Sequence, residues 1–312
     1  MRKTRTCCGI VKKASAALTT ALFAIAVICS RVCAQANQPP QNPPKQDMEL
    51  NTVLMECTFM LEGKNAQGQP SIGTGFVMGR PFVNQPGKGK YVLITAAHVF
   101  SETAGDTVIL HLRRKIGDNN FEHVPIPIQI RANGQPLWTQ NPNVDVAVIY
   151  IRIPNGIVLP LLPTDLLADD DMLSKFQIHP GDELECLGYP LGLASNDVGF
   201  PILRSGKIAS YPLLPTSTTK SFLFDFRVFK GNSGGPVYLV ESGRSYQGMT
   251  HLGETIHFIV GLVSEEKILP QVTIGVYEQE VHQLQLGLAV VVHSSLIKQT
   301  VNMLPDPDTM PD

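Results

Sequence analysis

The chain has 312 residues, of which 43% are hydrophobic and 17% are charged, and its formal net charge is −2. Such a composition provides ample apolar side chains for a core and excludes a largely disordered protein. The length suits one large domain or two small ones. No segment repeats with a period of 20–50 residues, which excludes solenoids and propellers.

The first 34 residues have the layout of a secretory signal peptide. Five basic residues within Arg2–Lys13 precede an uncharged, mostly apolar stretch of 16 residues, Ala14–Cys29. Val32-Cys33-Ala34 then offers small residues for cleavage after Ala34, with Ala36 as an alternative site. An uncleaved membrane anchor is the competing interpretation, but 16 residues fall short of the roughly 20 that a spanning helix needs. We therefore expect a protein that is exported, periplasmic or secreted, without a stable membrane anchor.

Removal of residues 1–34 would change both the charge and the cysteine content. It takes away six basic residues and no acidic one, which leaves 19 basic against 27 acidic residues, a net charge of −8. That balance disfavours nucleic acid as a partner, because nucleic-acid binding requires neutralisation of phosphates. Of six cysteines, only Cys57 and Cys186 would remain. Both lie in apolar, strand-like runs, and we expect two buried thiols rather than a disulfide.

The remaining chain reads as a linker followed by many short strands. Residues 35–47 form a Pro-rich linker without an apolar face. Short apolar or alternating runs then recur between turn signals, which is typical of an all-β protein. Six runs fall in the first half: Leu50–Leu61, Ser71–Met78, Tyr91–Thr95, Thr107–Leu112, Glu122–Arg131 and Val144–Ile151. Six more follow: Glu183–Gly188, Pro201–Ser210, Ser221–Phe226, Pro236–Val240, Ile256–Ser264 and Leu286–Val292. His293–Met303 is predicted to be a short C-terminal helix, and residues 304–312 a mobile tail.

Three separated motifs carry candidate catalytic residues. Ser233 lies in Gly231-Asn232-Ser233-Gly234-Gly235, where glycines allow positive φ and close approach of a substrate. The same string is also a good turn sequence between two strands. His98 follows the apolar run Tyr91–Ile94, and Asp145 enters the strand-like run Val144–Ile151. A histidine, an aspartate and a serine in these settings are the three parts of a Ser-His-Asp triad, since serine needs a neighbouring base to become a nucleophile.

With this His-Asp-Ser order, the sequence resembles the trypsin/chymotrypsin-like serine protease family. The resemblance is to the bacterial branch that includes the Deg/HtrA proteases and the glutamyl endopeptidases, but without the PDZ domain of the Deg/HtrA group. Three further strings match that branch: Gly73-Thr74-Gly75-Phe76, Gly188-Tyr189-Pro190-Leu191-Gly192 and Val260-Gly261-Leu262-Val263-Ser264. The resemblance implies two antiparallel six-stranded β-barrels within residues 48–303. The first would cover about 48–160 and the second about 175–292, with the site between them.

The resemblance also assigns roles to individual residues. Ser233 would attack the scissile carbonyl, His98 would act as the base, and Asp145 would orient the His98 ring. The backbone N–H groups of Gly231 and Ser233 would form the oxyanion hole. Asn232 stands where zymogen-type members carry an aspartate that pairs with a new N-terminus. Asparagine has no charge for that pair, so we expect no activation of this kind.

Specificity is less determined by the sequence. By resemblance, Arg227 lies at the base of the primary pocket, where it would favour acidic substrates. If Arg227 instead reaches solvent, Val228 would leave a small apolar pocket. Ser264 belongs to a strand whose edge would bind the extended substrate.

No spacing of histidines, cysteines and carboxylates predicts a metal site, and no phosphate loop or dinucleotide motif predicts a cofactor. The sequence therefore predicts an exported serine endopeptidase that acts on protein or peptide substrates through an acyl-enzyme. The alternative is a binding module that keeps the protease fold without activity. The oligomeric state is left open.

Overall fold

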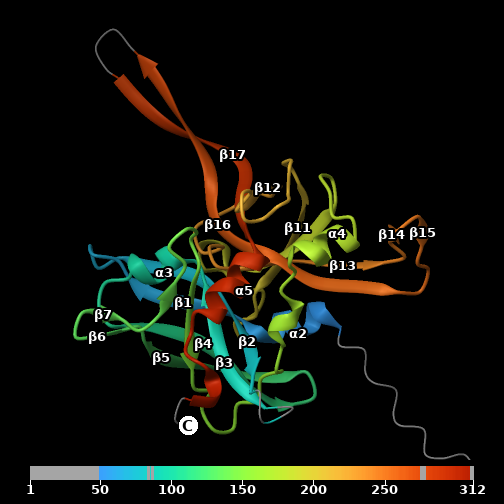
Figure 1. The fold of residues 1–312 in the computed structure, drawn as a ribbon. Helices are drawn as coiled ribbons and strands as arrows, with labels where there is room; N and C mark the ends of the chain where they lie inside the picture. The colour runs from blue at the N-terminus through green and yellow to red at the C-terminus, as the bar shows by residue number, and fades with distance from the viewer. Residues whose placement is uncertain (1–48, 83–84, 86–87, 275–278, 310–312) are drawn as a thin grey trace, which may run out of the picture. The chain divides into compact units, whose positions relative to one another are not determined.

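The computed structural model describes residues 49–82, 85, 88–274 and 279–309. The predicted signal peptide, the predicted linker and residues 310–312 lie outside the described residues. In the described part, an antiparallel sheet is followed along the chain by a closed antiparallel barrel (Figure 1).

The first element is a helix, α2 (Leu50–Cys57), although a strand was predicted from Leu50 onward. The Glu49 carboxylate caps this helix by accepting a hydrogen bond of 2.9 Å from the Thr52 N–H. Leu50, Leu54 and Cys57 are buried, and their spacing of four and three residues is that of one helix face. The strand prediction was wrong here because an apolar run of this length fits a strand or a helix. The cap formed by Glu49 favours the helix.

The sheet of the N-terminal half has seven strands in the order β5-β4-β1-β2-β3-β9-β8, where one closed six-stranded barrel was expected. All its pairs are antiparallel, and β5 and β8 form its edges. A separate two-stranded ladder joins β6 (Arg131–Ala132) to β7 (Gln135–Pro136). The seven strands are β1 (Thr58–Lys64), β2 (Pro70–Pro81), β3 (Gly89–Thr95), β4 (Thr107–Gly117), β5 (Asn120–Gln129), β8 (Thr139–Gln140) and β9 (Ala147–Ile151).

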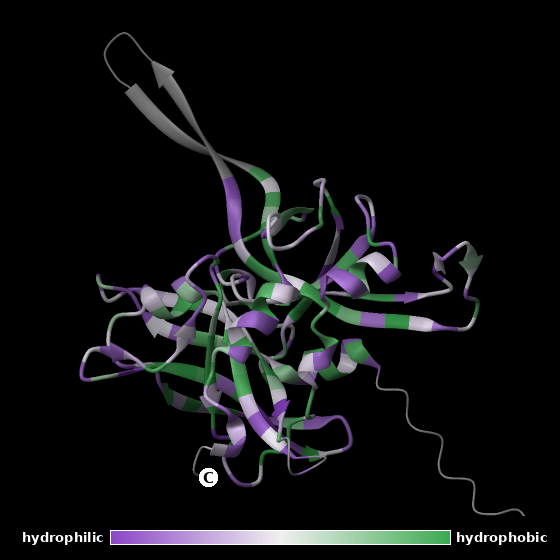
Figure 2. Ribbon diagram, in the orientation of Figure 1, coloured by the Kyte–Doolittle hydropathy of each residue, from purple (hydrophilic) through white to green (hydrophobic). Residues whose placement is uncertain are grey.

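The C-terminal half contains the six-stranded barrel that was predicted, closed in the order β10-β11-β12-β17-β16-β13. The ladder β14 (Ser245–Tyr246) and β15 (Met249–Thr250) lies outside it. Figure 2 shows hydrophobic segments along the strands and hydrophilic ones at many connecting turns, as expected for strands around a core. The six barrel strands are β10 (Glu183–Gly188), β11 (Ile202–Ile208), β12 (Ser221–Asp225), β13 (Pro236–Ser242), β16 (Thr255–Ile274) and β17 (Gln279–His293).

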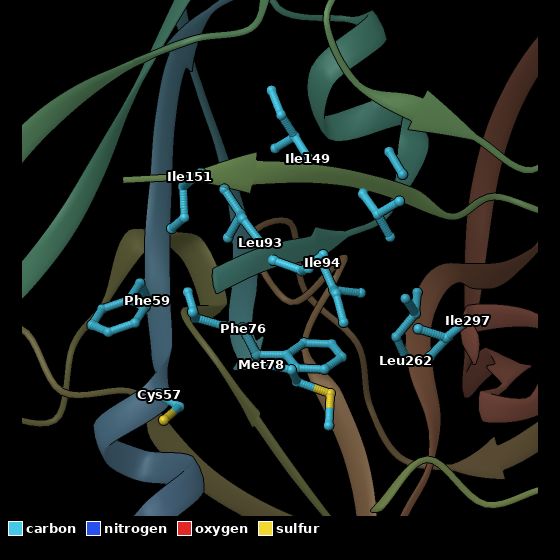
Figure 3. Packing of buried hydrophobic residues seen from close by; sticks show 14 of the residues in the cluster. Cys57, Phe59, Phe76, Met78, Leu93, Ile94, Ile149, Ile151, Leu262 and Ile297 are labelled. Atoms are coloured by element: carbon cyan, nitrogen blue, oxygen red, sulfur yellow. The ribbon is translucent and has the colours of Figure 1, made fainter. Parts of the chain in front are cut away.

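Short helices connect and close these two halves. They are α3 (Ala97–Ser101), η1 (Thr164–Leu166), α4 (Asp170–Lys175), η2 (Pro190–Gly192), α5 (Ser294–Asn302) and η3 (Pro307–Thr309). The predicted C-terminal helix is confirmed as α5, which buries Leu296 and Val301. In Figure 3, Ile297 of α5 lies beside Leu262 of β16, in the same core cluster as Phe76 of β2. Thus α5 joins the barrel to the core of the sheet.

The described part of the predicted tail is held in place. The Arg80 side chain donates hydrogen bonds of 3.0 and 2.9 Å to the carbonyls of Leu304 and Pro305. The Tyr150 hydroxyl donates to the Pro305 carbonyl at 2.8 Å. Residues 304 and 305 of the predicted tail are thus bound to two polar side chains of the sheet through their backbone carbonyls.

Strands β16 and β17 continue past the barrel as a two-stranded arm (Figure 1). The partner strand β13 ends its pairing with β16 at Leu262, and β12 ends its pairing with β17 at Leu288. Beyond these points the two strands pair only with each other, up to Ile274 and Gln279. The arm begins after Glu266, whose partner Ala289 still pairs with β12.

Candidate active site

His98 and Asp145 meet at the ends of two neighbouring strands. His98 is the second residue of α3, which follows β3, and Asp145 lies two residues before β9, the partner of β3. His98 Nδ1 and Asp145 Oδ2 are 2.7 Å apart. Asp145 Oδ1 also accepts a 2.9 Å hydrogen bond from the His98 backbone N–H. A carboxylate on Nδ1 fixes the tautomer and leaves Nε2 free to take up a proton.

Ser264 completes the environment of the carboxylate. Its hydroxyl donates a hydrogen bond of 2.7 Å to Asp145 Oδ2. A break in the β16–β17 register lies between Val263 and Glu265, so Ser264 is the extra residue of a bulge. Ser264 was expected on a strand edge that would bind the extended substrate. Its buried hydroxyl binds Asp145, a contact that the sequence did not reveal.

The charges of this pair support each other. Burial by itself would lower the pKa of His98, but the hydrogen bond and the negative charge of Asp145 outweigh it and raise that pKa. The carboxylates of Glu102 and Glu265 raise it further. Burial would raise the pKa of Asp145, and the bonds from His98 and Ser264 lower it on balance. The pair therefore favours an ionised aspartate beside a histidine that is readily protonated.

The turn that carries Ser233 is bound through its carbonyl groups. Thr74 of β2 donates from its N–H to the Ser233 carbonyl at 2.8 Å and from its hydroxyl to the Gly231 carbonyl at 2.6 Å. The Leu191 N–H donates to the Lys230 carbonyl at 2.6 Å. Among the hydrogen bonds of the described residues, none has the N–H of Gly231 or Ser233 as donor. Two free amides on one turn are the donors that an oxyanion hole requires.

Two glycines of this turn cannot be replaced without moving backbone. Gly231 has φ of +98°, and a Cβ there would lie 2.1 Å from the Tyr189 carbonyl oxygen. Gly234 has φ of +87°, and a Cβ there would lie 2.1 Å from the Thr74 carbonyl oxygen. The glycines in the motif are thus explained by both conformation and close approach.

Ser233 and His98 line one cavity of about 380 Å³ between the sheet and the barrel. Its wall also includes Ile72, Glu102 and Lys230, none of which the sequence analysis proposed as site residues. Within the described residues, no hydrogen bond joins Ser233 Oγ to the His98 ring. Such bonds are often long without substrate and shorten when substrate binds.

The two remaining specificity candidates lie elsewhere. Arg227 is exposed, and its guanidinium lies 5.2 Å from the centre of the Phe229 ring. Val228 is buried in the core of the barrel. Neither lines the cavity that holds Ser233 and His98. The charged residues that do line it are Lys230 and Glu102, and they can affect which substrates the cavity binds.

The described residues include no cluster of three or more histidine, cysteine or carboxylate side chains arranged to hold a metal ion. Cys57 and Cys186 are free and buried, as predicted, and burial raises the pKa of each thiol to about 12. Neither thiol is therefore a nucleophile at neutral pH. Among the described helices, none has the length and apolar character needed to cross a bilayer.

The closed six-stranded barrel and the antiparallel sheet before it define the chymotrypsin-like fold, which places the protein in a class of proteases. Within that class the chain belongs to the family of trypsin-like peptidase domains, because residues 73–245, more than half of the 312, match this family. The resemblance found in the motifs is thereby confirmed, and it supports a protease.

Solved structures of bacterial proteases are similar to the chain at low identity. The MamO protease domain from Magnetospirillum magneticum, in its apo form, is 15% identical, with a TM-score of 0.43 over 82% of this chain and 100% of that chain. The active form of the Rv3671c protease from M. tuberculosis is 15% identical, with a TM-score of 0.41 over 87% and 89%. The protease Anisep from Arthrobacter nicotinovorans is 13% identical, with a TM-score of 0.42 over 80% and 95%. No curated protein matches the chain.

Proposed function

We propose that the protein is a serine endopeptidase that uses Ser233, His98 and Asp145. The observation that carries this proposal is the 2.7 Å contact between His98 Nδ1 and Asp145 Oδ2, with the other side of His98 in the same cavity as Ser233. A histidine oriented in this way is the base that a serine nucleophile requires.

In the first half-reaction, Ser233 Oγ attacks the scissile carbonyl carbon while His98 Nε2 takes the hydroxyl proton. The resulting imidazolium is stabilised by the ionised Asp145, which itself keeps its charge. The protonated His98 then donates its proton to the leaving amine as the C–N bond breaks. The products are a free amine and an ester between Ser233 and the acyl part of the substrate.

In the second half-reaction, water attacks that ester. His98 Nε2 accepts a proton from the water and returns it to Ser233 Oγ as the ester bond breaks. In both half-reactions the negative oxygen of the tetrahedral intermediate would bind the N–H groups of Gly231 and Ser233. Each such donor lowers the barrier by about 3 kcal/mol in comparable sites.

The proposal is tested by reacting the purified protein with a fluorophosphonate, which forms a bond only with an activated serine. Intact mass is read for the wild type, for Ser233→Ala and for Asp145→Asn. We expect one adduct on the wild type, none on Ser233→Ala, and a rate reduced by about 10⁴-fold for Asp145→Asn. A folded wild type that forms no adduct would overturn the proposal and leave the inactive binding module.

We also propose that residues 1–34 direct export and are then removed. The support is the order of basic, apolar and small residues in that segment. Expression in a bacterial host should give a secreted or periplasmic protein whose N-terminus is Gln35 or Asn37. An unprocessed protein in the cytoplasm would contradict this.

A further inference from the structure

Arg113 of β4 is a buried guanidinium whose partners are carbonyls rather than carboxylates. Only 3% of the residue is exposed, and among the described residues no carboxylate forms an ion pair with it. Its Nη2 donates hydrogen bonds to the carbonyls of Met55, Glu56 and Thr58 at 2.9, 3.2 and 2.7 Å. Met55 and Glu56 lie in the last turn of α2, where carbonyls lack partners within the helix.

The other nitrogen of Arg113 reaches across to the barrel half. Nη1 donates to the Gly199 carbonyl at 2.6 Å and to the Tyr189 hydroxyl at 3.1 Å. The guanidinium also lies 4.5 Å from the centre of the Phe59 ring and 4.2 Å from that of Phe200. Arg113 therefore fastens both ends of residues 189–200 to α2 and the sheet.

Tyr189 and Leu191 in turn contact the turn that carries the candidate nucleophile. The Tyr189 carbonyl is the atom that leaves no room for a Cβ at Gly231. The Tyr189 N–H donates to Thr74 Oγ1 at 3.3 Å, and that hydroxyl binds the Gly231 carbonyl. The Leu191 N–H binds the Lys230 carbonyl. A displacement of residues 189–191 would thus release the Lys230 carbonyl, which shares its peptide group with the Gly231 N–H, and would disturb the Thr74 hydroxyl that binds the Gly231 carbonyl.

The cost of burying the Arg113 guanidinium indicates that this residue does more than stabilise the fold. Removal of a guanidinium from water is costly, and burial lowers the pKa of Arg113. Apolar residues of similar volume can stabilise such a site equally well. What an apolar residue cannot do is bind five acceptors from separate segments at fixed angles, as the planar guanidinium does.

On these grounds we propose that Arg113 is a positioning residue, which acts through Tyr189 and residues 189–200 to hold the Gly231–Ser233 turn in the shape that acyl transfer requires. This inference rests on the proposed endopeptidase function. Asn232, the residue between the two amides, is buried, but its Nδ2 has no hydrogen-bond partner among the described residues. The carbonyls of Lys230, Gly231 and Ser233 are held from the sheet and from residues 189–191, while the Gly234 N–H is held by the Val263 carbonyl of β16.

Two variants, Arg113→Lys and Tyr189→Phe, should slow the labelling of Ser233 to different extents. Arg113→Lys keeps the charge but offers three donors on one atom, which cannot reach both sets of acceptors. Tyr189→Phe keeps the ring and removes only the hydroxyl. We expect the maximal rate of fluorophosphonate labelling to fall about 10- to 100-fold in Arg113→Lys and severalfold in Tyr189→Phe, since each lost hydrogen bond to a charged group corresponds to roughly tenfold. The concentration for half-maximal rate should change less than the maximal rate, because the part of the cavity wall formed by residues 70–72 and 98–102 makes no hydrogen bond with Arg113.

Arg244 provides the matched control, because it is another buried arginine that binds carbonyls. It donates to the carbonyls of Phe176 and Gln177 at 2.7 and 2.8 Å and pairs with Asp182, away from residues 189–200. Arg244→Lys should lower the melting temperature as Arg113→Lys does, yet label at the wild-type maximal rate. Equal losses of labelling in both lysine variants would assign Arg113 a purely structural role.

Hydrogen exchange of the full chain separates this inference from the proposed function. In Arg113→Lys, the amides of residues 189–193 and 228–236 should exchange faster than in the wild type, while β12 and β17 keep their protection. If the wild type labels and Arg113→Lys labels equally fast, the inference is wrong. If the wild type does not label, the proposed function is wrong, and hydrogen exchange is then the only test of whether Arg113 positions the turn. Faster exchange confined to these two segments supports the positioning role, and unchanged exchange overturns it.

Discussion

His98 lies near three carboxylates, and each affects its proton affinity. Asp145 binds the ring directly, while Glu102 and Glu265 act through their charge. Only the neutral form of His98 can take the proton of Ser233. Because the pKa of His98 is raised above its ordinary value of 6.5, labelling of Ser233 should be lost as the pH falls through that raised value.

Substitution Glu102→Gln tests this electrostatic account. Removal of a negative charge beside His98 lowers its pKa, so the acid limb of the labelling rate should shift to lower pH. The measurement is the second-order rate of fluorophosphonate labelling between pH 5 and 9, at low salt. Glu122→Gln is the control, since Glu122 is exposed and pairs with Arg114 on β4. A shift of the Glu102→Gln limb to higher pH, or an equal shift in both variants, would contradict the account.

The sequence predicted the positions of some site residues and not those of others. Local patterns around His98 and Asp145 were sufficient, because each follows or precedes a strand and the two strands pair. The bond from the Ser264 hydroxyl to Asp145 was not predicted, because it depends on a one-residue bulge in β16. Arg227 was placed by counting back from Ser233, yet its side chain is exposed. Bulges and side-chain directions depend on pairing partners, which a single sequence does not reveal.

At the scale of elements, β16 and β17 are longer than predicted. The strands expected at Ile256–Ser264 and Leu286–Val292 are present, and pairing continues well beyond them. Residues just after Ser264 are charged and were not interpreted as strand. The helix α2 was not predicted, because the apolar residues of its short run fit a strand as well as a helix. The Glu49 side chain, which caps the helix, is the local feature that distinguishes the two.

The arm formed by β16 and β17 can be removed without loss of the barrel. Past Leu262 and Leu288 its strands pair only with each other, and an isolated two-stranded hairpin contributes little stability. Replacement of residues 268–285 by Asn-Gly, a favoured two-residue hairpin turn, should leave the melting temperature within about 3 °C of wild type. Labelling of Ser233 should persist, because the Ser264–Asp145 bond lies on the barrel side of the cut.

Circular dichroism melting and intact mass after fluorophosphonate treatment measure both outcomes. A matched variant that replaces Arg131–Gln135 by Asn-Gly removes the β6–β7 ladder and with it the bonds from Arg131 to the carbonyls of α3. That variant should lose labelling through displacement of His98. An arm deletion that unfolds the protein would show that the arm stabilises the barrel.

At the scale of the molecule, the candidate site depends on contacts between the sheet and the barrel. Thr74 and Arg113 belong to the sheet, yet they hold the turn and the segment that the barrel half contributes. The motif strings predicted which halves meet, but not these bonds, because they join residues far apart in the chain, such as Thr74 and Gly231, which are 157 positions apart. Helix α5 packs in the same interface, and we expect His293, directly before it, to make the stability of the whole molecule depend on pH.

His293 is 1% exposed, and neither of its ring nitrogens has a hydrogen-bond partner among the described residues. Burial lowers the pKa of His293 to about 4, against a small opposing effect of Asp170. The unfolded chain therefore binds a proton at His293 from about pH 6.5 downward, while the folded chain binds it only near pH 4. Folding stability should fall by about 3 kcal/mol across this interval, because each unit of pKa difference corresponds to 1.36 kcal/mol.

His293→Phe should remove this part of the pH dependence. The ring would still pack on Phe222, whose centre lies 5.0 Å from that of His293, and no hydrogen bond would be lost. We expect equal or greater stability at pH 7 and, at pH 4, a melting temperature on the order of 5–10 °C above wild type. His257→Gln, at a partly buried histidine of β16, serves as the control for the loss of a histidine as such. If His293→Phe loses stability between pH 6.5 and 4 as steeply as wild type does, the acid sensitivity arises from other groups, and His293 is not the residue that links protonation to unfolding.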